Sequence, residues 1–207
     1  FNGRPNDNIG ITLFAGETFT QCPLTVDHAV LLDMIHNIKC GLITDGTAVG
    51  MGIANAVTRL KDSKAKSKVI ILLTDGTNNK GDISPMTAAE IAKSFGIRVY
   101  TIGVGTNGMA PYPYPVGNTV QYVSMPVEID EKTLTEIAGT TDGNYFRATS
   151  NSKLKEVYEE IDKLEKTKLN VKEYSKRDEE YHWFALAAFL CVLLEVLLRN
   201  SVLKKIP

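Results

Sequence analysis

The sequence predicts an α/β domain built on a doubly wound, mostly parallel sheet. Short apolar runs of strand-forming residues alternate with amphipathic stretches of helical period along most of the chain. Apolar runs of this kind are typical of strands covered on both faces, and strands that alternate with helices form parallel sheets. A longer apolar stretch near the C-terminus sets the last residues apart from this domain.

Each element is predicted from its residues, in chain order. The expected strands are apolar and rich in β-formers, and they cover 9–14, 69–73, 99–104 and 145–147. The expected helices carry one apolar stripe each, and they cover 27–38, 47–60, 84–96, 130–139 and 154–164. The helix from Ser84 is the best defined, because a capping serine is followed by Pro85 and the stretch ends at Gly96.

The segment 107–129 interrupts this alternation with four prolines: Pro111, Pro113, Pro115 and Pro126. In a doubly wound sheet it would emerge at the carboxyl ends of the strands, where such folds bind ligands. Long loops inside compact domains are usually functional or mobile. We therefore expect either a partner-recognition loop or a structural excursion that contains a small hairpin near 120–125.

Composition and charge argue against two classes of ligand. The 207 residues carry a formal net charge of −1 and no long run of one charge, so nothing indicates nucleic-acid binding. The residues Gly103, Gly105 and Gly108 match a dinucleotide fingerprint, but a proline-rich stretch follows where a helix should begin. We expect no nucleotide binding.

Three segments in fixed order resemble the von Willebrand factor A (VWA) family, whose fold is Rossmann-like. They are the strand and turn at 9–17, the helix-opening Asp45-Gly-Thr47 and the strand end at 69–76, which finishes in Asp75-Gly76. The resemblance implies a metal-ion-dependent adhesion site that holds Mg²⁺, a hard cation that prefers oxygen ligands. Thr47 would supply a direct hydroxyl ligand and Asp75 a carboxylate acting mainly through water. A partner protein's acidic side chain would complete the shell.

Both predicted ligands have ordinary alternative roles: Thr47 as a helix N-cap and Asp75 as a turn residue before Gly76. The sequence also departs from the family pattern, because it contains no Asp-x-Ser-x-Ser motif. We expect that motif, with the family's first strand and helix, upstream of Phe1. The chain as given would then bind Mg²⁺ weakly or not at all, and would expose an apolar gap prone to aggregation.

The C-terminal stretch predicts a transmembrane helix. Residues 183–198 are apolar apart from Glu195, and 183–203 would form the span. The VWA domain would cover 1–170, a juxtamembrane linker 171–182 and a basic tail 204–207. Because basic residues follow the span, the C-terminus would be cytoplasmic and the VWA domain periplasmic or external at a bacterial inner membrane. A buried or interfacial helix is the alternative.

The VWA pattern, the Tyr-Pro segment and the apolar tail together resemble the bacterial aerotolerance (Bat) family, and within it the BatA group. The resemblance implies metal-dependent protein binding in a complex with sister VWA proteins and a MoxR-type ATPase, linked to stress or oxygen tolerance. The chain is expected not to be an enzyme, since His28, His36 and His182 lie beside no nucleophile or metal-ligand pattern. The alternatives are a structural membrane subunit without metal and a metal-assisted hydrolase.

Overall fold

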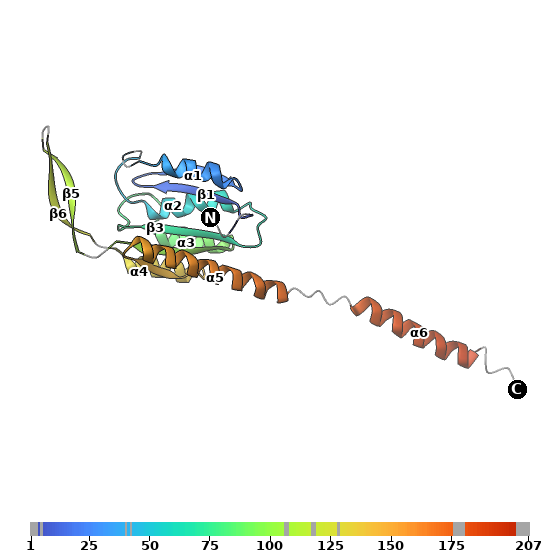
Figure 1. Ribbon diagram of the computed structural model, residues 1–207. Coiled ribbons are helices and arrows are strands. Elements are labelled where there is room, and N and C mark those ends of the chain that lie inside the picture. Colours follow the sequence, from blue (N-terminus) through green and yellow to red (C-terminus); the bar gives the residue numbers. More distant parts are fainter. Residues whose placement is uncertain are drawn as a thin grey trace. The chain divides into compact units, whose positions relative to one another are not determined.

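A computed structural model of the protein describes residues 4, 6–39, 41, 43–105, 108–116, 119–127, 129–175 and 181–201. The chain divides into two compact units, Phe1–Glu165 and Lys166–Pro207. Figure 1 shows the elements, which follow in this order: β1 (Ile9–Phe14), β2 (Thr18–Thr25), α1 (His28–His36), α2 (Val49–Leu60), β3 (Lys68–Thr74), α3 (Pro85–Ser94), β4 (Ile97–Val104), β5 (Gly108–Val116), β6 (Thr119–Val127), α4 (Glu131–Thr140), β7 (Tyr145–Ala148), α5 (Asn151–Ser175) and α6 (Tyr181–Ser201).

A parallel sheet forms the centre of the first unit. Its strand order is β3-β4-β7, and both neighbouring pairs are parallel. β3 and β4 pair in continuous register, from Lys68 opposite Ile97 to Thr74 opposite Gly103. The predicted α/β fold with a parallel sheet is confirmed.

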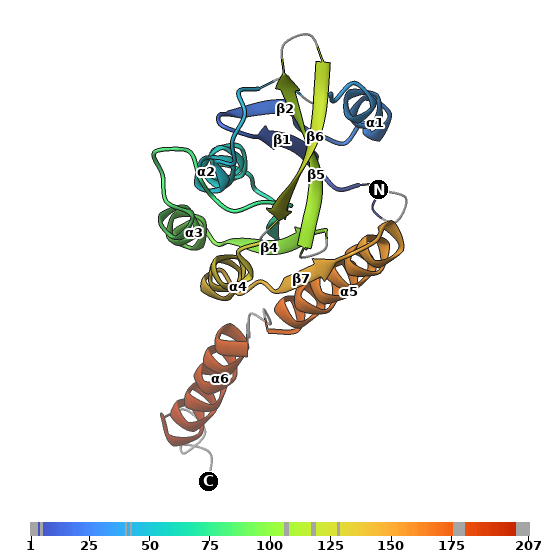
Figure 2. The same cartoon turned by 90° about the vertical axis from the view of Figure 1, so that its left-hand side faces the viewer.

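Helices cover the parallel sheet on both faces. Because side chains alternate along a strand, Ile70 and Leu72 of β3 join the core formed with α2, α3 and α4. Tyr100 and Ile102 of β4 join a second core with α5, to which Val157 contributes. Figure 2 shows α2, α3 and α4 on one side of the sheet and α5 on the other.

The N-terminal strands form a separate antiparallel pair. β1 was expected, but its antiparallel partner β2 was not, because its threonines, glutamine and proline hide the strand pattern. In the described part of the chain, β1 pairs with β2 alone and β3 pairs with β4 alone. A first strand upstream of Phe1 stays a prediction.

The helix boundaries agree with the sequence where caps define them. The Ser84 side chain accepts from the Thr87 N–H at the start of α3, and Gly96 adopts a positive φ of 63° after it. α2, however, begins at Val49 and not at Thr47. α5 runs to Ser175, into residues that were predicted as linker; residues 176–180 and the predicted tail 204–207 lie outside the described residues.

The proline-rich segment forms a long hairpin in which β5 and β6 pair with each other over nine positions. The small hairpin predicted near 120–125 was therefore too short. Pro111, Pro113 and Pro115 fall at alternate positions, which antiparallel pairing tolerates when the missing N–H groups point away from the partner strand.

The second unit contains α6, whose described side chains, 184–198, are all exposed. Within the described residues, no helix combines the length and the apolar character that a membrane span requires.

Candidate metal site at the carboxyl edge of the sheet

Asp75 directly follows β3, at the edge of the sheet where the parallel strands end. Its side chain is exposed. β4 ends at the same edge, and so does β7, because all three strands run in one direction. This is the edge at which open α/β sheets bind ligands.

Thr47 lies beside the same strand end. A Cβ placed on Gly76, the residue after Asp75, would lie 3.2 Å from the Thr47 Oγ1 atom. The structure thus brings the Thr47 hydroxyl against the Asp75-Gly76 turn, although 28 residues separate Thr47 from Asp75 in the sequence. Both predicted ligands sit at one edge of the sheet.

The loop that carries Thr47 is held in place by the loop after β3. The Thr47 N–H donates to Oδ1 of Asn79 at 2.8 Å, and the Asn79 N–H donates to the Thr47 carbonyl at 3.0 Å. Lys80 N–H donates to the same carbonyl at 3.2 Å. The backbone N–H and C=O of Thr47 are therefore both hydrogen-bonded to the neighbouring loop. Its side-chain hydroxyl is not used for this and can act as a ligand.

The turn after β1 holds the other side of this loop. The Ala48 N–H donates to the Ala15 carbonyl at 2.6 Å, and the Gly16 N–H donates to the Thr44 carbonyl at 2.7 Å. The approach is close, since a Cβ on Gly16 would lie 2.8 Å from the Thr44 carbonyl oxygen. The three family-like segments of the sequence thus meet in space.

The structure does not use Thr47 as a helix N-cap or the Asp75 side chain to close the turn before Gly76, which are the alternative roles of these residues. The N-cap of α2 is Ala48, which makes no side-chain cap, and the Val49 N–H is instead bonded by Oδ1 of Asn78 at 2.8 Å. The turn after β3 is closed by Thr74, whose Oγ1 accepts from the Gly76 N–H at 3.3 Å. In the described part of the chain, no group bonds the Thr47 hydroxyl or the Asp75 carboxylate.

The two oxygen donors suit Mg²⁺ in kind but not in number. A hydroxyl and a carboxylate are hard ligands, whereas Mg²⁺ requires near-octahedral coordination. Among the described residues, no group of three or more histidine, cysteine, aspartate or glutamate side chains is arranged to hold a metal. The residues present therefore fit part of a magnesium shell.

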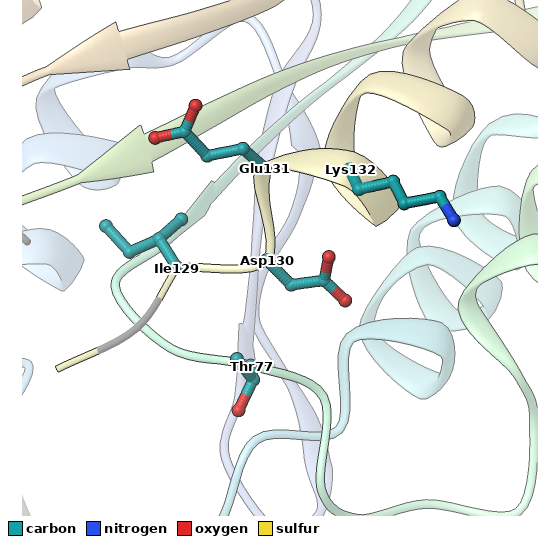
Figure 3. Close-up of a pocket in the computed structure, with 5 residues that line it drawn as sticks. All are labelled: Thr77, Ile129, Asp130, Glu131 and Lys132. Atoms are coloured by element: carbon teal, nitrogen blue, oxygen red, sulfur yellow. The ribbon is translucent and has the colours of Figure 1, made fainter. Parts of the chain in front are cut away.

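A shallow depression of about 490 Å³ lies near this edge, lined by Thr77, Ile129, Asp130, Glu131 and Lys132. Figure 3 shows Thr77, two residues beyond Asp75, below the segment that leads into α4. Asp130 caps α4 and accepts from the Thr133 N–H at 3.0 Å. Hydrogen bonds from Thr133 hold the pKa of the Asp130 carboxyl below its usual value. The depression is therefore lined mostly by polar side chains and by charged side chains of both signs.

Sequence reasoning missed Asn78 and Asn79, the residues that fix the loop. The signal was available, because asparagine amides commonly bond backbone groups in turns, and two of them follow a strand end here. Their targets, Val49 and Thr47, are 29 and 32 residues away, which no local pattern reveals.

Comparison with known proteins agrees with this architecture. The family described as von Willebrand factor type A domain matches residues 1–160. The chain belongs to this family.

The relatives include Bat proteins of known structure. The chain is 34% identical to a conserved hypothetical protein BatB from Bacteroides thetaiotaomicron, with a TM-score of 0.66, over 78% of this chain and 80% of that one. It is 31% identical to an aerotolerance-related membrane protein from Bacteroides fragilis, with a TM-score of 0.64, over 76% and 80%. The predicted VWA and Bat resemblance is confirmed, whereas the BatA group remains a prediction.

Two further relatives extend the comparison. An uncharacterized protein of Borreliella burgdorferi is 26% identical over 98% of this chain, which spans 60% of that protein's length. Proximal thread matrix protein 1 from the mussel byssus, with a zinc-occupied MIDAS motif, is 26% identical, with a TM-score of 0.57, over 77% of this chain and 36% of that one.

Proposed function

We propose that this chain is a membrane-attached VWA module that binds a protein partner through a metal ion and is not an enzyme. The observation that carries the proposal is the Thr47 hydroxyl lying against Gly76, the residue that directly follows the exposed Asp75. Thr47 would ligate Mg²⁺ directly and Asp75 mainly through water. The ion would supply an open coordination position, and an acidic side chain of the partner would fill it.

The zinc-occupied MIDAS motif in the mussel protein supports metal use at a site of this kind. Mg²⁺ is the cation proposed here, because the two side chains offer oxygen atoms only. The remaining ligands would come from an Asp-x-Ser-x-Ser segment upstream of Phe1. Without them, this chain would hold Mg²⁺ weakly or not at all.

Membrane attachment is proposed through α6. Its described side chains, 184–198, are exposed and include one charged residue, Glu195. The similarity to an aerotolerance-related membrane protein supports this assignment. The VWA domain would lie on the periplasmic or external side of a bacterial inner membrane, with a cytoplasmic C-terminus.

The proposed partners are sister VWA proteins and a MoxR-type ATPase, in a complex linked to stress or oxygen tolerance. Similarity to Bat proteins supports this choice. A metal-assisted hydrolase would need a general base beside the ion. His28 and His36 lie in α1, where their rings contact the carbonyls of Asp7 and Leu32, and His182 lies in α6.

The test is a pull-down of the MoxR-type ATPase and the sister VWA proteins by the full-length protein, in Mg²⁺ or in EDTA. We expect capture to require Mg²⁺ and to be lost in Asp75→Ala and in Thr47→Ala. Asp62→Ala is the matched control, because Asp62 is also exposed but precedes β3, at the opposite edge of the sheet. Capture that survives EDTA and both substitutions would favour a structural subunit and overturn metal-dependent binding.

A further inference from the structure

The hairpin formed by β5 and β6 has two edges of unequal chemistry. Its four prolines share one parity in the ladder: Pro111, Pro113 and Pro115 face Ser124, Tyr122 and Val120, and Pro126 faces Met109. Antiparallel ladders alternate between pairs that exchange two hydrogen bonds and pairs that exchange none. Because proline has no N–H and the pairing is continuous, all four prolines occupy non-bonded pairs.

The positions of the prolines determine which backbone hydrogen-bonding groups point outward from each strand of the hairpin. Residues in non-bonded pairs direct their backbone groups away from the partner strand. The outer edge of β5 therefore presents the carbonyls of three prolines without their N–H groups, and it cannot pair with another strand. The outer edge of β6 presents both N–H and C=O at Val120, Tyr122 and Ser124, until Pro126 ends the series.

The outer edge of β6, which can pair with another strand, also has no charged residues along it. Exposed sheet edges are usually protected by charged residues, yet the stretch from Gly108 to Val127 contains no Asp, Glu, Lys or Arg. Within the described strands, β6 pairs with β5 alone. Apolar surface lies along it, since Tyr122 is 72% exposed and Val123 47% exposed.

We infer that two copies of this chain associate through antiparallel pairing of their β6 strands, centred on Tyr122. Tyr122 would face its counterpart, and Val120 would face Ser124 of the second copy. Every outward N–H would meet a C=O, giving about six hydrogen bonds across the two-fold axis. Figures 1 and 2 show β5 and β6 as an extended two-stranded ribbon, which pairing would convert into a four-stranded sheet.

Two features favour a second copy of this chain as the strand that pairs with β6: the absence of charge along the edge and the two-fold symmetry of the pairing. The edge carries no charge that would select a different partner or repel an identical one. Pairing of β6 with β6 consumes both competent edges and leaves the two proline-blocked edges outside. Association would therefore stop at a dimer and not continue into fibres.

Sedimentation of the full-length protein in mild detergent tests the dimer. We expect a dimer whose dissociation constant rises about tenfold or more in Tyr122→Pro, because this change removes an outward N–H and leaves the hairpin's own hydrogen bonds intact. The melting temperature should stay unchanged at concentrations where both proteins are monomeric, because only association is weakened. Met109→Pro is the matched control, since it alters the outward edge of β5 and should leave the dimer as it is.

Cysteine crosslinking tests the register, in a background of Cys40→Ser and Cys191→Ser. Tyr122→Cys should form a disulfide-linked dimer, because facing residues lie about 5.5 Å apart. Gln121→Cys should not, because its copies would be diagonal neighbours about 7–8 Å apart. A mixture of Val120→Cys and Ser124→Cys chains should crosslink, whereas neither should crosslink alone.

Three outcomes would overturn the inference: a monomer at all concentrations, an oligomer that Tyr122→Pro does not weaken, or crosslinking that ignores this register. A monomer that captures an added extended peptide along β6 would show that the edge serves a different chain. The two proposals can fail independently. Asp75→Ala should not change dimer formation, and Tyr122→Pro should not change the Mg²⁺-dependent capture of the partner.

Discussion

Tyr100 donates a hydrogen bond from its hydroxyl to Oε1 of Glu165 at 2.6 Å, and both side chains are buried. Arg98 forms a salt bridge with the same carboxylate oxygen, and the Ser67 hydroxyl donates to Oε2 at 2.9 Å. β4 supplies Arg98 and Tyr100, and α5 supplies Glu165. This network ties α5 to the parallel sheet.

Tyr100→Phe should destabilise the domain by about 1–3 kcal/mol, because a buried carboxylate loses a hydrogen-bond donor without gaining water. Chemical denaturation monitored by circular dichroism measures the change. Tyr158→Phe is the control, since Tyr158 is 41% exposed. Removal of its hydroxyl group should change the free energy of unfolding by less than about 0.5 kcal/mol. Equal stability of Tyr100→Phe and the native protein would contradict the role of the network.

The network should also make stability depend on pH. Burial alone would raise the pKa of Glu165, but hydrogen bonds from Tyr100, Arg98 and Ser67 outweigh burial and hold the pKa below its usual value. A carboxyl group with a lowered folded-state pKa contributes stability that is present above its unfolded pKa and is lost as the pH falls through the folded value. The loss should therefore occur below the ordinary glutamate pKa of about 4.3.

Denaturation curves measured from neutral pH down to about pH 3 test this dependence. Glu165→Gln should lose less stability over that range than the native protein does, because the titrating group is gone. Identical slopes for the two proteins would mean that Glu165 does not contribute to the acid sensitivity of the fold.

Two helical glycines should respond to alanine in opposite directions. A Cβ on Gly50 of α2 would lie 2.0 Å from the Ile83 carbonyl oxygen, whereas a Cβ on Gly139 of α4 would meet nothing within 4 Å. Alanine normally stabilises a helix by about 0.5–1 kcal/mol over glycine. Gly139→Ala should gain that amount, and Gly50→Ala should lose more than about 1 kcal/mol. Thermal melts of the two variants decide this, and a stabilising Gly50→Ala would refute the close packing of α2 on the following loop.

Asn78→Ala should cost about 1 kcal/mol of stability, because its side chain caps α2 in place of the missing cap at Ala48. Asn78→Asp should retain the native stability, since a carboxylate oxygen can accept the same bond and its charge suits a helix N-terminus. Urea denaturation compares the three proteins. If Asn78→Asp were as destabilised as Asn78→Ala, the stabilisation would come from the amide nitrogen of Asn78 and not from the capping of α2 by its side-chain oxygen.

Local patterns determined much of the fold. Ser84, Pro85 and Gly96 define α3 in the sequence because capping and positive φ depend on a few adjacent residues. The alternation of apolar runs and amphipathic stretches likewise predicted a mostly parallel sheet, and β3 and β4 are parallel strands in it. Thr47 and Asp75 could be selected from a family resemblance, and the structure places them at one edge of the sheet.

The tertiary structure alone decided what depends on pairing between distant segments. Thr18–Thr25 becomes a strand because β1 pairs with it, and the proline-rich segment becomes a full hairpin because its prolines share one parity in the ladder. Glu165 lies one helical turn after Ile161, on the apolar stripe of α5, and is buried, although glutamate as a residue type is mostly exposed. Its hydrogen bonds come from Ser67, Arg98 and Tyr100, whose positions only the folded sheet brings together.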